Sequence, residues 1–394
     1  MEFQLDREPK NKSLARGIRM NWRKAALSIG LVCAVLLVGS VGSASNEMET
    51  ITAGTPLPMP RVVKDRPLHV GYIGPELTAE SCQRNWHQTQ IEIEHRKWKL
   101  SAEPTASGVP VQRNALQTLI QKNVDAIVLQ YIEMEPLRDL ILEARKRGIG
   151  VYCIDTELRP GVLINVTIPN GVAGAMMAQF VIDRVEGKGN VAILNQTNHI
   201  LRQRCYVARA LFTSKVDWPN LSLVGFEDLP STGWEKAAFD FTTAWLQKYG
   251  DKLDAIFAGF DTPGVFAARA VEAAGFTKEQ VFVTGVDGGS EAYDMIRKGS
   301  PFIATTSQPF ELYTHTVFGI IDEVQVKGIA PGAKGSSIPK TRTIYSDAVI
   351  TTEENLPAVG SIIHEVFRAT YYDPAKKNEW YFWGKPYVIT SAAQ

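Results

Sequence analysis

Residues 125–155, DAIVLQYIEMEPLRDLILEARKRGIGVYCID, decide the fold class. Two short apolar runs, DAIVLQ and GVYCID, flank a segment whose leucine, isoleucine and alanine side chains recur at helical spacing between residues 137 and 144. The cations of Arg145-Lys146-Arg147 and then Gly148 end that segment, as cations and a glycine commonly end a helix. The pattern predicts a strand, a helix and a second strand parallel to the first, with both strands buried.

The same alternation continues on both sides of this unit. Ala267, Ala270 and Val271 repeat the helical spacing, and Gly275 closes it. Further apolar runs are predicted as buried strands: LHVGYIG (68–74), NVAILN (190–195), DAIFAGF (254–260), VFVTGVDG (281–288) and FIATTSQ (302–308). TIYSDAVIT (343–351) is interpreted as a closing strand. These are too many strands for one small sheet, so we expect an α/β fold of two Rossmann-like lobes with right-handed crossovers.

Length and composition fit a soluble globular protein of two domains. The chain has 394 residues, of which 45% are apolar and 21% charged. Lysine and arginine number 42, and aspartate and glutamate also number 42, so the formal net charge is zero. This balance gives no electrostatic reason to expect a nucleic-acid partner.

Residues 1–44 are predicted to form a signal peptide. Arg23-Lys24 precede the uncharged, mostly apolar run AALSIGLVCAVLLVGSV (25–41), and the small residues Gly42-Ser43-Ala44 follow it. The run of 17 residues is at the short limit for a membrane-spanning helix, so an uncleaved anchor is the alternative. Met20 offers an alternative start for this leader. We therefore expect export to the periplasm.

The segments next to the alternating region have other patterns. Residues 45–66 are interpreted as an extended linker, because TAGTPLPMPRVVKDRP (52–67) contains four prolines and no apolar period. Residues 353–370 have a helical pattern, and the tail NEWYFWGKPYVIT (378–390) is dense in aromatic side chains. This tail either packs against a lobe or contacts a partner protein.

Three cysteines follow the leader: Cys82, Cys153 and Cys205. They form no CxxC pair, and the six histidines form no HxxxH or HExxH, so neither a metal site nor a cofactor is predicted. An odd number of cysteines in an exported protein leaves at least one free thiol.

The motifs of common enzyme classes are absent from the sequence. No predicted strand is followed by GxGxxG, and neither GxxxxGK[ST] nor GxSxG occurs. No Ser, His and Asp set stands at strand ends, which disfavours a hydrolase. The leader, and the lack of a helix-turn-helix ahead of Leu68, exclude a DNA-binding regulator. We therefore expect a binding protein with no catalytic residues.

Polar and aromatic residues follow the carboxyl ends of the predicted strands, where open α/β sheets bind ligands. Single carboxylates, amides, one arginine and aromatic faces suit a neutral polyhydroxyl ligand. The candidates are Gln130-Tyr131, Asp155-Thr156, Asn170, Phe260-Asp261, Asp287 and Gln308, with Arg204 and Trp234 in the segments after other strands.

Each candidate also has an ordinary structural interpretation. Asp155, Asp287 and Asn170 could each cap the helix that follows, a common role for these residue types. Trp234 could be a core residue, and Gln308 could be a turn residue. Their recurrence at the same end of the strands favours the binding interpretation.

Four segments together resemble the periplasmic sugar-binding proteins of ABC transporters. They run from LIQKNVDAIVLQ to GVYCID (119–155), from NVTIPNG to NVAILN (165–195), from DAIFAGFD through VFVTGVDG to Gly299 (254–299), and from IATTSQPF to Gly328 (303–328). The resemblance covers roughly residues 67–350 and is to the ribose-binding-like branch of the type I periplasmic binding proteins, which share their fold with LacI-type cores.

The resemblance implies roles for individual residues. Asp155 and Gln130 would bind sugar hydroxyls from the first lobe, Arg204 would lie over the sugar ring, and Trp234 would stack near it. Asp287 and Gln308 would act from the second lobe, with Asn170 at its start. Phe260-Asp261 stands where the family usually has Asn-Asp, and Trp86 is a candidate for a stacking face that the first strand otherwise lacks. These departures argue against ribose itself and favour a different sugar, a polyol or another small hydroxylated compound.

The resemblance also implies a mechanism, in which two lobes joined by three crossover segments close around the ligand without covalent chemistry. The partner would be an ABC transporter permease, or alternatively a membrane sensor kinase or chemoreceptor, and the protein is expected to be a monomer. The expected domains are a signal peptide (1–44), a linker (45–66), an N-terminal lobe (67–168 and 309–335), a C-terminal lobe (169–308 and 336–352) and a C-terminal extension (353–394).

Overall fold

A computed structural model describes residues 57–357 and 359. The predicted signal peptide, the first part of the predicted linker, most of the predicted 353–370 helix and the aromatic tail lie outside the described residues. In the part of the chain that is described, no helix has the length and apolarity that crossing a membrane requires.

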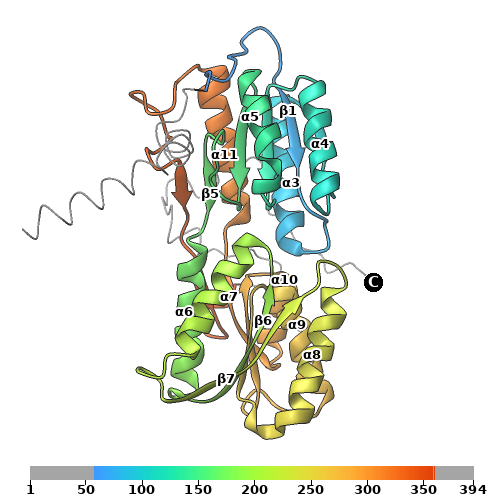
Figure 1. Cartoon of the computed structure of the whole chain (residues 1–394), viewed down its shortest axis with the longest axis vertical. Helices are drawn as coiled ribbons and strands as arrows, with labels where there is room; N and C mark the ends of the chain where they lie inside the picture. Colours follow the sequence, from blue (N-terminus) through green and yellow to red (C-terminus); the bar gives the residue numbers. More distant parts are fainter. Residues whose placement is uncertain (1–56, 358, 360–394) are drawn as a thin grey trace, which may run out of the picture. The chain divides into compact units, whose positions relative to one another are not determined.

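The first lobe is built on a six-stranded sheet in which all neighbouring strands run parallel (Figure 1). Its strand order is β11-β5-β4-β3-β1-β2. The strands are β1 (His69–Ile73), β2 (Lys99–Glu103), β3 (Ala126–Gln130), β4 (Gly150–Ile154), β5 (Asn165–Thr167) and β11 (Thr343–Tyr345). Its helices are α3 (Glu80–Arg96), α4 (Val109–Gln121), α5 (Arg138–Lys146) and α11 (Phe310–Ile321), with the short turns η1 (Glu135–Leu137) and η3 (Asp322–Val326).

The second lobe repeats this plan with the strand order β12-β10-β9-β8-β6-β7, in which only β12 is antiparallel. The strands are β6 (Lys188–Gln196), β7 (Asn220–Leu229), β8 (Ala255–Ala258), β9 (Phe282–Asp287), β10 (Phe302–Ser307) and β12 (Val349–Thr351). The helices are α6 (Asn170–Arg184), α7 (His199–Phe212), α8 (Trp234–Tyr249), α9 (Asp261–Ala273) and α10 (Ser290–Arg297), with the turn η2 (Gly250–Lys252).

Each sheet has an apolar core on both faces, which explains why its central strands are continuous apolar runs. Alternate residues of a strand point to opposite faces, so Val128 packs with α3 and α11 while Ile127 and Leu129 pack with α4 and α5. In the second lobe, Ile256 likewise faces α8, α9 and α10, and Phe257 faces α6 and α7. The predicted α/β class with two parallel sheets is confirmed.

The chain passes between the lobes three times: after β5, after β10 and between β11 and β12. The third crossing was expected near residues 330–340, with residues 336–352 in the second lobe, and for Thr343–Tyr345 this is wrong. TIYSDAVIT forms two strands, of which β11 pairs with β5 of the first sheet and β12 with β10 of the second. Each half covers the otherwise unpaired edge of one sheet, so the crossing is Ser346-Asp347-Ala348.

Residues 57–66, predicted as part of an extended linker, are bound to the first lobe instead. The backbone N–H of Arg61 donates to the carbonyl of Gly148 (2.8 Å), and that of Val63 donates to the carbonyl of Gln325 (2.7 Å). The Val63 side chain is buried in the first-lobe core. This proline-containing segment has no regular secondary structure, but it is an integral part of the lobe.

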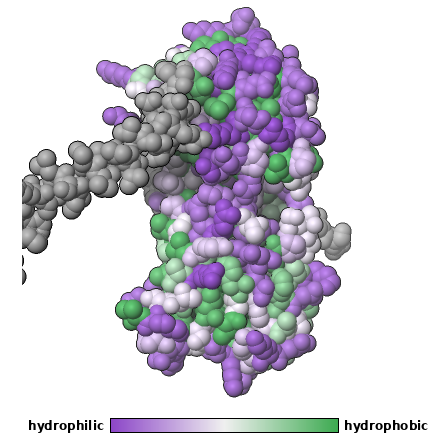
Figure 2. Space-filling model, viewed as in Figure 1, coloured by the Kyte–Doolittle hydropathy of each residue, from purple (hydrophilic) through white to green (hydrophobic). Residues whose placement is uncertain are grey.

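The protein surface seen in Figure 2 is largely hydrophilic, with small apolar patches separated by polar side chains. Scattered exposed apolar residues are ordinary for a folded protein. The hydropathy of this face therefore points to no binding region, and the search for one rests on the polar residues at the strand ends.

Candidate functional site

A cavity of about 250 Å³ lies where the carboxyl ends of the strands in both sheets meet. Six of the ten predicted binding residues line it: Gln130, Asp155, Arg204, Trp234, Phe260 and Asp287. They come from both lobes and from segments up to 157 positions apart in the chain, between Gln130 and Asp287. The recurrence of polar residues at strand ends therefore did predict a shared location.

The first-lobe wall of the cavity carries a carboxylate and an amide. Asp155 stands directly after β4, and its Oδ1 accepts a hydrogen bond from the Thr167 hydroxyl (2.7 Å). Gln130 ends β3, and its Oε1 accepts a hydrogen bond from the Tyr72 hydroxyl. Both side chains are thus oriented by first-lobe partners.

Arg204 projects from α7 on the opposite wall and is fully buried. Its Nε donates to Oδ1 of Asn170 (2.7 Å), and its Nη1 donates to the carbonyl of Gly259 (3.0 Å) and to Oδ1 of Asp287 (3.3 Å). Burial lowers the pKa of Arg204, but the carboxylates of Asp287 and Asp155 outweigh that effect and raise it. The guanidinium is therefore a fixed positive charge whose Nη2 remains available for hydrogen bonding.

Asp287 ends β9 and is held from two sides. Its Oδ1 accepts hydrogen bonds from Arg204 and from Nε2 of Gln308 (2.8 Å), so both donors reach the same oxygen. Burial and, to a smaller extent, the nearby carboxylate of Asp261 raise the pKa of Asp287 to about 8 against the opposing effect of Arg204. A ligand hydroxyl that donated to Oδ2 would stabilise the ionised form.

Three residues around the cavity have backbone angles that favour glycine. Tyr131 has a φ of 53°, Asp155 a φ of 44° and Asp287 a φ of 145°. Such conformations cost about 1–3 kcal/mol each and persist where the surrounding structure imposes them. All three follow or end central strands and line the cavity, so this backbone strain is concentrated at the candidate site.

An aromatic pair forms another part of the wall. The rings of Trp234 and Phe260 lie 5.1 Å apart at 63°, an edge-to-face arrangement. Both rings also belong to the apolar core that covers α8, α9 and α10. Trp234 therefore combines the two roles considered from the sequence, as a core residue that also lines the cavity.

Four predicted binding residues do not line this cavity. Asn170 and Gln308 lie behind it and hold Arg204 and Asp287 in place. Asp261 accepts hydrogen bonds from the Gly289 N–H (2.8 Å) and the Thr305 hydroxyl (2.6 Å), and so supports the loop after β9. Trp86 packs on Tyr72 with ring centres 5.1 Å apart, within the first-lobe core.

The helix-capping alternatives are wrong for this structure. α6 and α10 have no side-chain cap hydrogen bond, so Asn170 and Asp287 do not act as caps. Asp155 precedes strand β5 and not a helix, and its carboxylate binds Thr167. The three side chains instead serve the network around the cavity.

The sequence analysis missed several cavity residues. Cys82, from α3, and Phe310, the first residue of α11, line the cavity, as does Glu133 in the loop after β3. Cys82 and Phe310 belong to helices, so their position near strand ends depends on lobe packing and leaves no local pattern in the sequence. All three cysteines after the leader are free and buried, which confirms the expectation of at least one free thiol.

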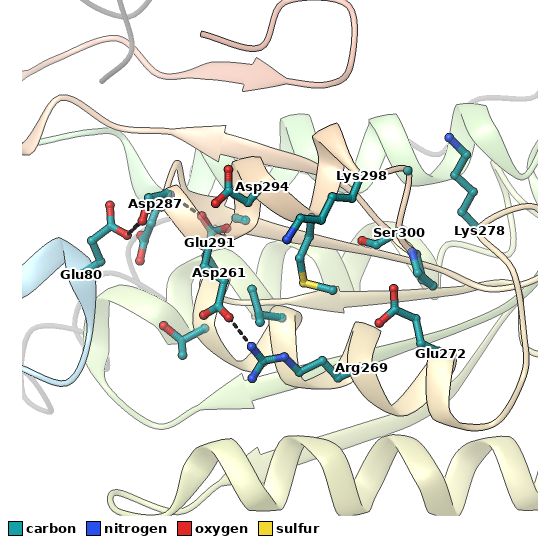
Figure 3. A pocket seen from close by; sticks show the side chains of 18 of the residues that line it. Glu80, Asp261, Arg269, Glu272, Lys278, Asp287, Glu291, Asp294, Lys298 and Ser300 are labelled. Atoms are coloured by element: carbon teal, nitrogen blue, oxygen red, sulfur yellow. Dashed lines mark hydrogen bonds and ion pairs between the residues drawn. The ribbon is translucent and has the colours of Figure 1, made fainter. Parts of the chain in front are cut away.

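A wider groove of about 910 Å³ adjoins the cavity and shares Asp287 with it (Figure 3). It runs along α9 and α10 and carries both signs of charge, including Glu80, Arg269, Glu291 and Lys298. Its charges are largely paired on the surface, as in the Arg269–Glu291 ion pair. Among residues 57–357 and 359, no three His, Cys, Asp or Glu side chains gather into a metal-binding group.

Comparisons with known proteins agree with this geometry. The chain is 24% identical over 263 residues to the xylitol-binding protein of Mycolicibacterium smegmatis, which covers 65% of this chain and 70% of that protein. The fold is similar to a 5-methylthioribose transporter solute binding protein from Thermotoga lettingae (TM-score 0.67, 19% identity, 78% of this chain and 93% of that one). It is also similar to an ABC transporter solute binding protein from Agrobacterium vitis with bound allitol (TM-score 0.63, 21% identity, 74% and 97%).

A family model also matches more than half of the chain. The model of the periplasmic binding protein domain matches residues 90–317, which include five strands of the second sheet, most of the first sheet and nine of the ten predicted binding residues. The chain belongs to the periplasmic binding protein domain family.

Proposed function

We propose that this protein is an exported solute-binding protein that captures a sugar or polyol between its lobes and delivers it to an ABC transporter permease. The observation that carries the proposal is the cavity at the meeting strand ends, where Asp155 and Arg204 face one small space from opposite lobes. Relatives include a D-apiose import binding protein from Paraburkholderia graminis and a fructose import binding protein from Bifidobacterium longum. These names support import over sensing as the output.

The ligand-binding residues in this proposal are those that face the cavity. The carboxylates of Asp155 and Asp287 accept hydrogen bonds from ligand hydroxyl groups, and the Gln130 amide can donate or accept. Arg204 donates to ligand oxygens through Nη2. Trp234 and Phe260 cover the apolar C–H face of the ligand. Asn170, Gln308 and Asp261 act indirectly by holding Arg204, Asp287 and the loop after β9.

The charge balance of the cavity narrows the ligand class. Glu76, Glu133 and Asp155 line it, against the single cation Arg204, while Asp287, whose pKa burial raises to about 8, adds no full negative charge at neutral pH. An acidic sugar would bring a further negative charge into a partly buried space, where like charges interact strongly. We therefore propose a ligand without a carboxylate or phosphate group.

The remaining parts of the proposal concern location, assembly and chemistry. The basic leader and apolar run of residues 1–44 support export to the periplasm. The protein would act as a monomer, since one chain supplies both of the lobes that enclose the ligand. The protein would bind its ligand without turnover, because lobe closure alone changes the shape that the permease recognises.

A thermal-shift screen tests this function. Xylitol, D-apiose, fructose, allitol, D-allose and myo-inositol are the first compounds to test, since similar proteins are named for them or hold them. A compound that binds should raise the melting temperature, and more so at higher concentration. At a concentration of 100 times Kd, binding adds about 2.7 kcal/mol to the free energy of unfolding. Recovery of the unchanged compound after incubation would show binding without turnover. If no hydroxylated compound raised the melting temperature, the proposed ligand class would be wrong.

A further inference from the structure

Two glutamates of the first lobe bind the N-termini of two helices of the second lobe. Oε2 of Glu80, the first residue of α3, accepts hydrogen bonds from the Ser290 N–H (2.8 Å) and the Ser290 hydroxyl (2.6 Å). Oε1 of Glu133, in the loop after β3, accepts a hydrogen bond from the His199 N–H (2.8 Å). Ser290 is the first residue of α10 and His199 the first residue of α7.

These contacts match what a helix N-terminus needs. The first N–H groups of a helix have no acceptor within the helix, and a carboxylate there is favoured by the helix dipole. α10 has Gly289 at its N-cap position and no side-chain cap of its own, so Glu80 supplies the missing acceptor from the other lobe. α7 has its own cap from Asn198 to Ile200, and Glu133 satisfies the neighbouring N–H.

The two helices are those that position the second-lobe part of the proposed site. α7 carries Arg204, and α10 begins three residues after Asp287. Glu133 lines the cavity itself, and Glu80 lines the adjoining groove, where Figure 3 shows it reaching from the first-lobe ribbon towards the Asp287 loop. The two contacts therefore lie on different sides of the cavity.

Neighbouring groups strengthen both contacts. Arg84, one turn after Glu80, binds both oxygens of Glu311 and donates to the carbonyls of Gly288 and Gln308 (3.3 Å each). Nε2 of His199 lies 3.1 Å from Oε2 of Glu157, another first-lobe carboxylate. Each glutamate therefore lies beside further polar contacts that join the two lobes.

We propose that Glu80 and Glu133 are positioning residues that stabilise the closed arrangement of the lobes by capping α10 and α7 across the cleft. Because donor and acceptor belong to different lobes, separation of the lobes breaks both contacts and returns the two carboxylates, the two N–H groups and the Ser290 hydroxyl to water. The two glutamates therefore shift the open–closed equilibrium through these contacts between the lobes. This inference rests on the proposed function and adds to it a role for both residues that the family resemblance does not identify.

The test compares Glu80→Ala, Glu133→Ala and the double variant with wild type in the full chain. Glu143→Ala is the matched control, because Glu143 is a first-lobe glutamate whose exposed ion pair with Arg147 stays within the first lobe. The probe is the compound with the highest affinity among xylitol, D-apiose, fructose, allitol, D-allose and myo-inositol. We expect each single variant to raise Kd about tenfold through faster dissociation. The reason is that loss of a hydrogen bond to a charged group changes an equilibrium constant by about tenfold or more.

A double-mutant cycle separates the effect of losing the Glu80–Ser290 contact from general damage to the fold. Ser290→Ala removes the hydroxyl contact and leaves the Ser290 N–H, so it should raise Kd less than Glu80→Ala does. The double change Glu80→Ala with Ser290→Ala should be no worse than Glu80→Ala alone. If Glu80→Ala and Glu133→Ala both keep the Kd and dissociation rate of Glu143→Ala, the inference is wrong while the proposed function stands.

Small-angle X-ray scattering decides the case in which wild type binds none of the six compounds, which would count against the proposed function. The ligand-free double variant should then have a larger radius of gyration than wild type and Glu143→Ala, because its lobes separate more readily. An unchanged radius of gyration in that case would overturn the inference independently of any ligand.

Discussion

Arg204 is the residue on which the proposed binding site depends most. It is the one cation among the residues that line the cavity, and it also holds Asn170 and Asp287. We expect Arg204→Ala to weaken binding of a confirmed sugar or polyol about 100-fold, or about 2.7 kcal/mol, because it removes charge-assisted hydrogen bonds and leaves buried acceptors unpaired. Isothermal titration calorimetry measures this loss.

The control for this change lies two positions earlier on the same helix. Arg202 is exposed and does not line the cavity, and its guanidinium donates to the backbone carbonyl of Thr197 (3.2 Å). Arg202→Ala should keep the wild-type affinity. Equal affinities for Arg204→Ala and Arg202→Ala would remove Arg204 from the proposed site.

Asp287 gives the ligand-free protein a specific dependence on pH. Its pKa in the folded protein is about 8, above the ordinary value near 4, so the folded state holds a proton that the unfolded state has lost. The contribution of this group to stability is complete below pH 4 and is lost as the pH rises towards 8. We therefore expect the melting temperature of wild type to fall more between pH 5 and pH 8 than that of Asp287→Asn.

A second aspartate serves as the control for the pH series. Asp139 is exposed, and its hydrogen bond with Arg113 lowers its pKa to about 2, so it does not titrate in this range. Asp139→Asn should reproduce the wild-type slope. Asp261, whose pKa burial raises to about 6, leaves part of the slope in every variant. Identical slopes for wild type and Asp287→Asn would contradict the raised pKa.

The residue types of the site were predictable from the sequence, but their exact roles were not. Asp155 and Asp287 end central strands, and their position at the strand ends is enough to place them at the cavity. Gln308 also follows a strand, but its amide donates a hydrogen bond to Asp287. Gln308 therefore supports the cavity wall from behind. Whether a strand-end side chain faces the ligand or a neighbour depends on side-chain packing, which no sequence spacing records.

At the scale of elements, the close packing of α6 on α7 positions Arg204. A Cβ at Gly174 of α6 would lie 2.6 Å from the Arg204 Cα, with backbone and not a flexible side chain in the way. Gly174→Ala should therefore push α7 away and destabilise the protein by about 1–3 kcal/mol, as overpacking usually does. It should also weaken binding, because Arg204 moves with its helix.

Gly319 of α11 provides the opposite case on the same kind of element. A Cβ at Gly319 would meet nothing within 4 Å, so Gly319→Ala should stabilise the protein by about 0.5–1 kcal/mol through helix propensity alone. Urea unfolding of the two variants measures both effects. If Gly174→Ala were as stable as Gly319→Ala, the close approach of α6 and α7 would not limit this position.

The strands that the sequence did not predict share a physical cause. β2 and β7 are the edges of their sheets, and most of their residues are only partly buried, so their patterns are mixed rather than continuously apolar. β5 has three residues, too few for a period to show. The central strands were identified because burial on both faces forces a continuous apolar run, a constraint that edge strands do not have.

The whole molecule consists of two lobes with separate cores, and this predicts how it unfolds. Each sheet packs its own helices on both faces, and only three short segments join the lobes. Without ligand, the polar contacts between the lobes are few, and we expect the lobes to unfold in two overlapping transitions. Differential scanning calorimetry should then give a calorimetric enthalpy larger than the van't Hoff enthalpy.

A bound sugar or polyol should make unfolding more cooperative, because it contacts both lobes and binds only when both are folded. The ratio of the two enthalpies should fall towards one as the concentration of a confirmed compound rises, and the melting temperature should rise with it. At the same compound concentration, Arg204→Ala should keep the enthalpy ratio of the ligand-free protein. Its lobes are intact, but its binding site is impaired. A ratio of one in the ligand-free protein would mean that the polar contacts between the lobes, including those of Glu80 and Glu133, already couple the two cores.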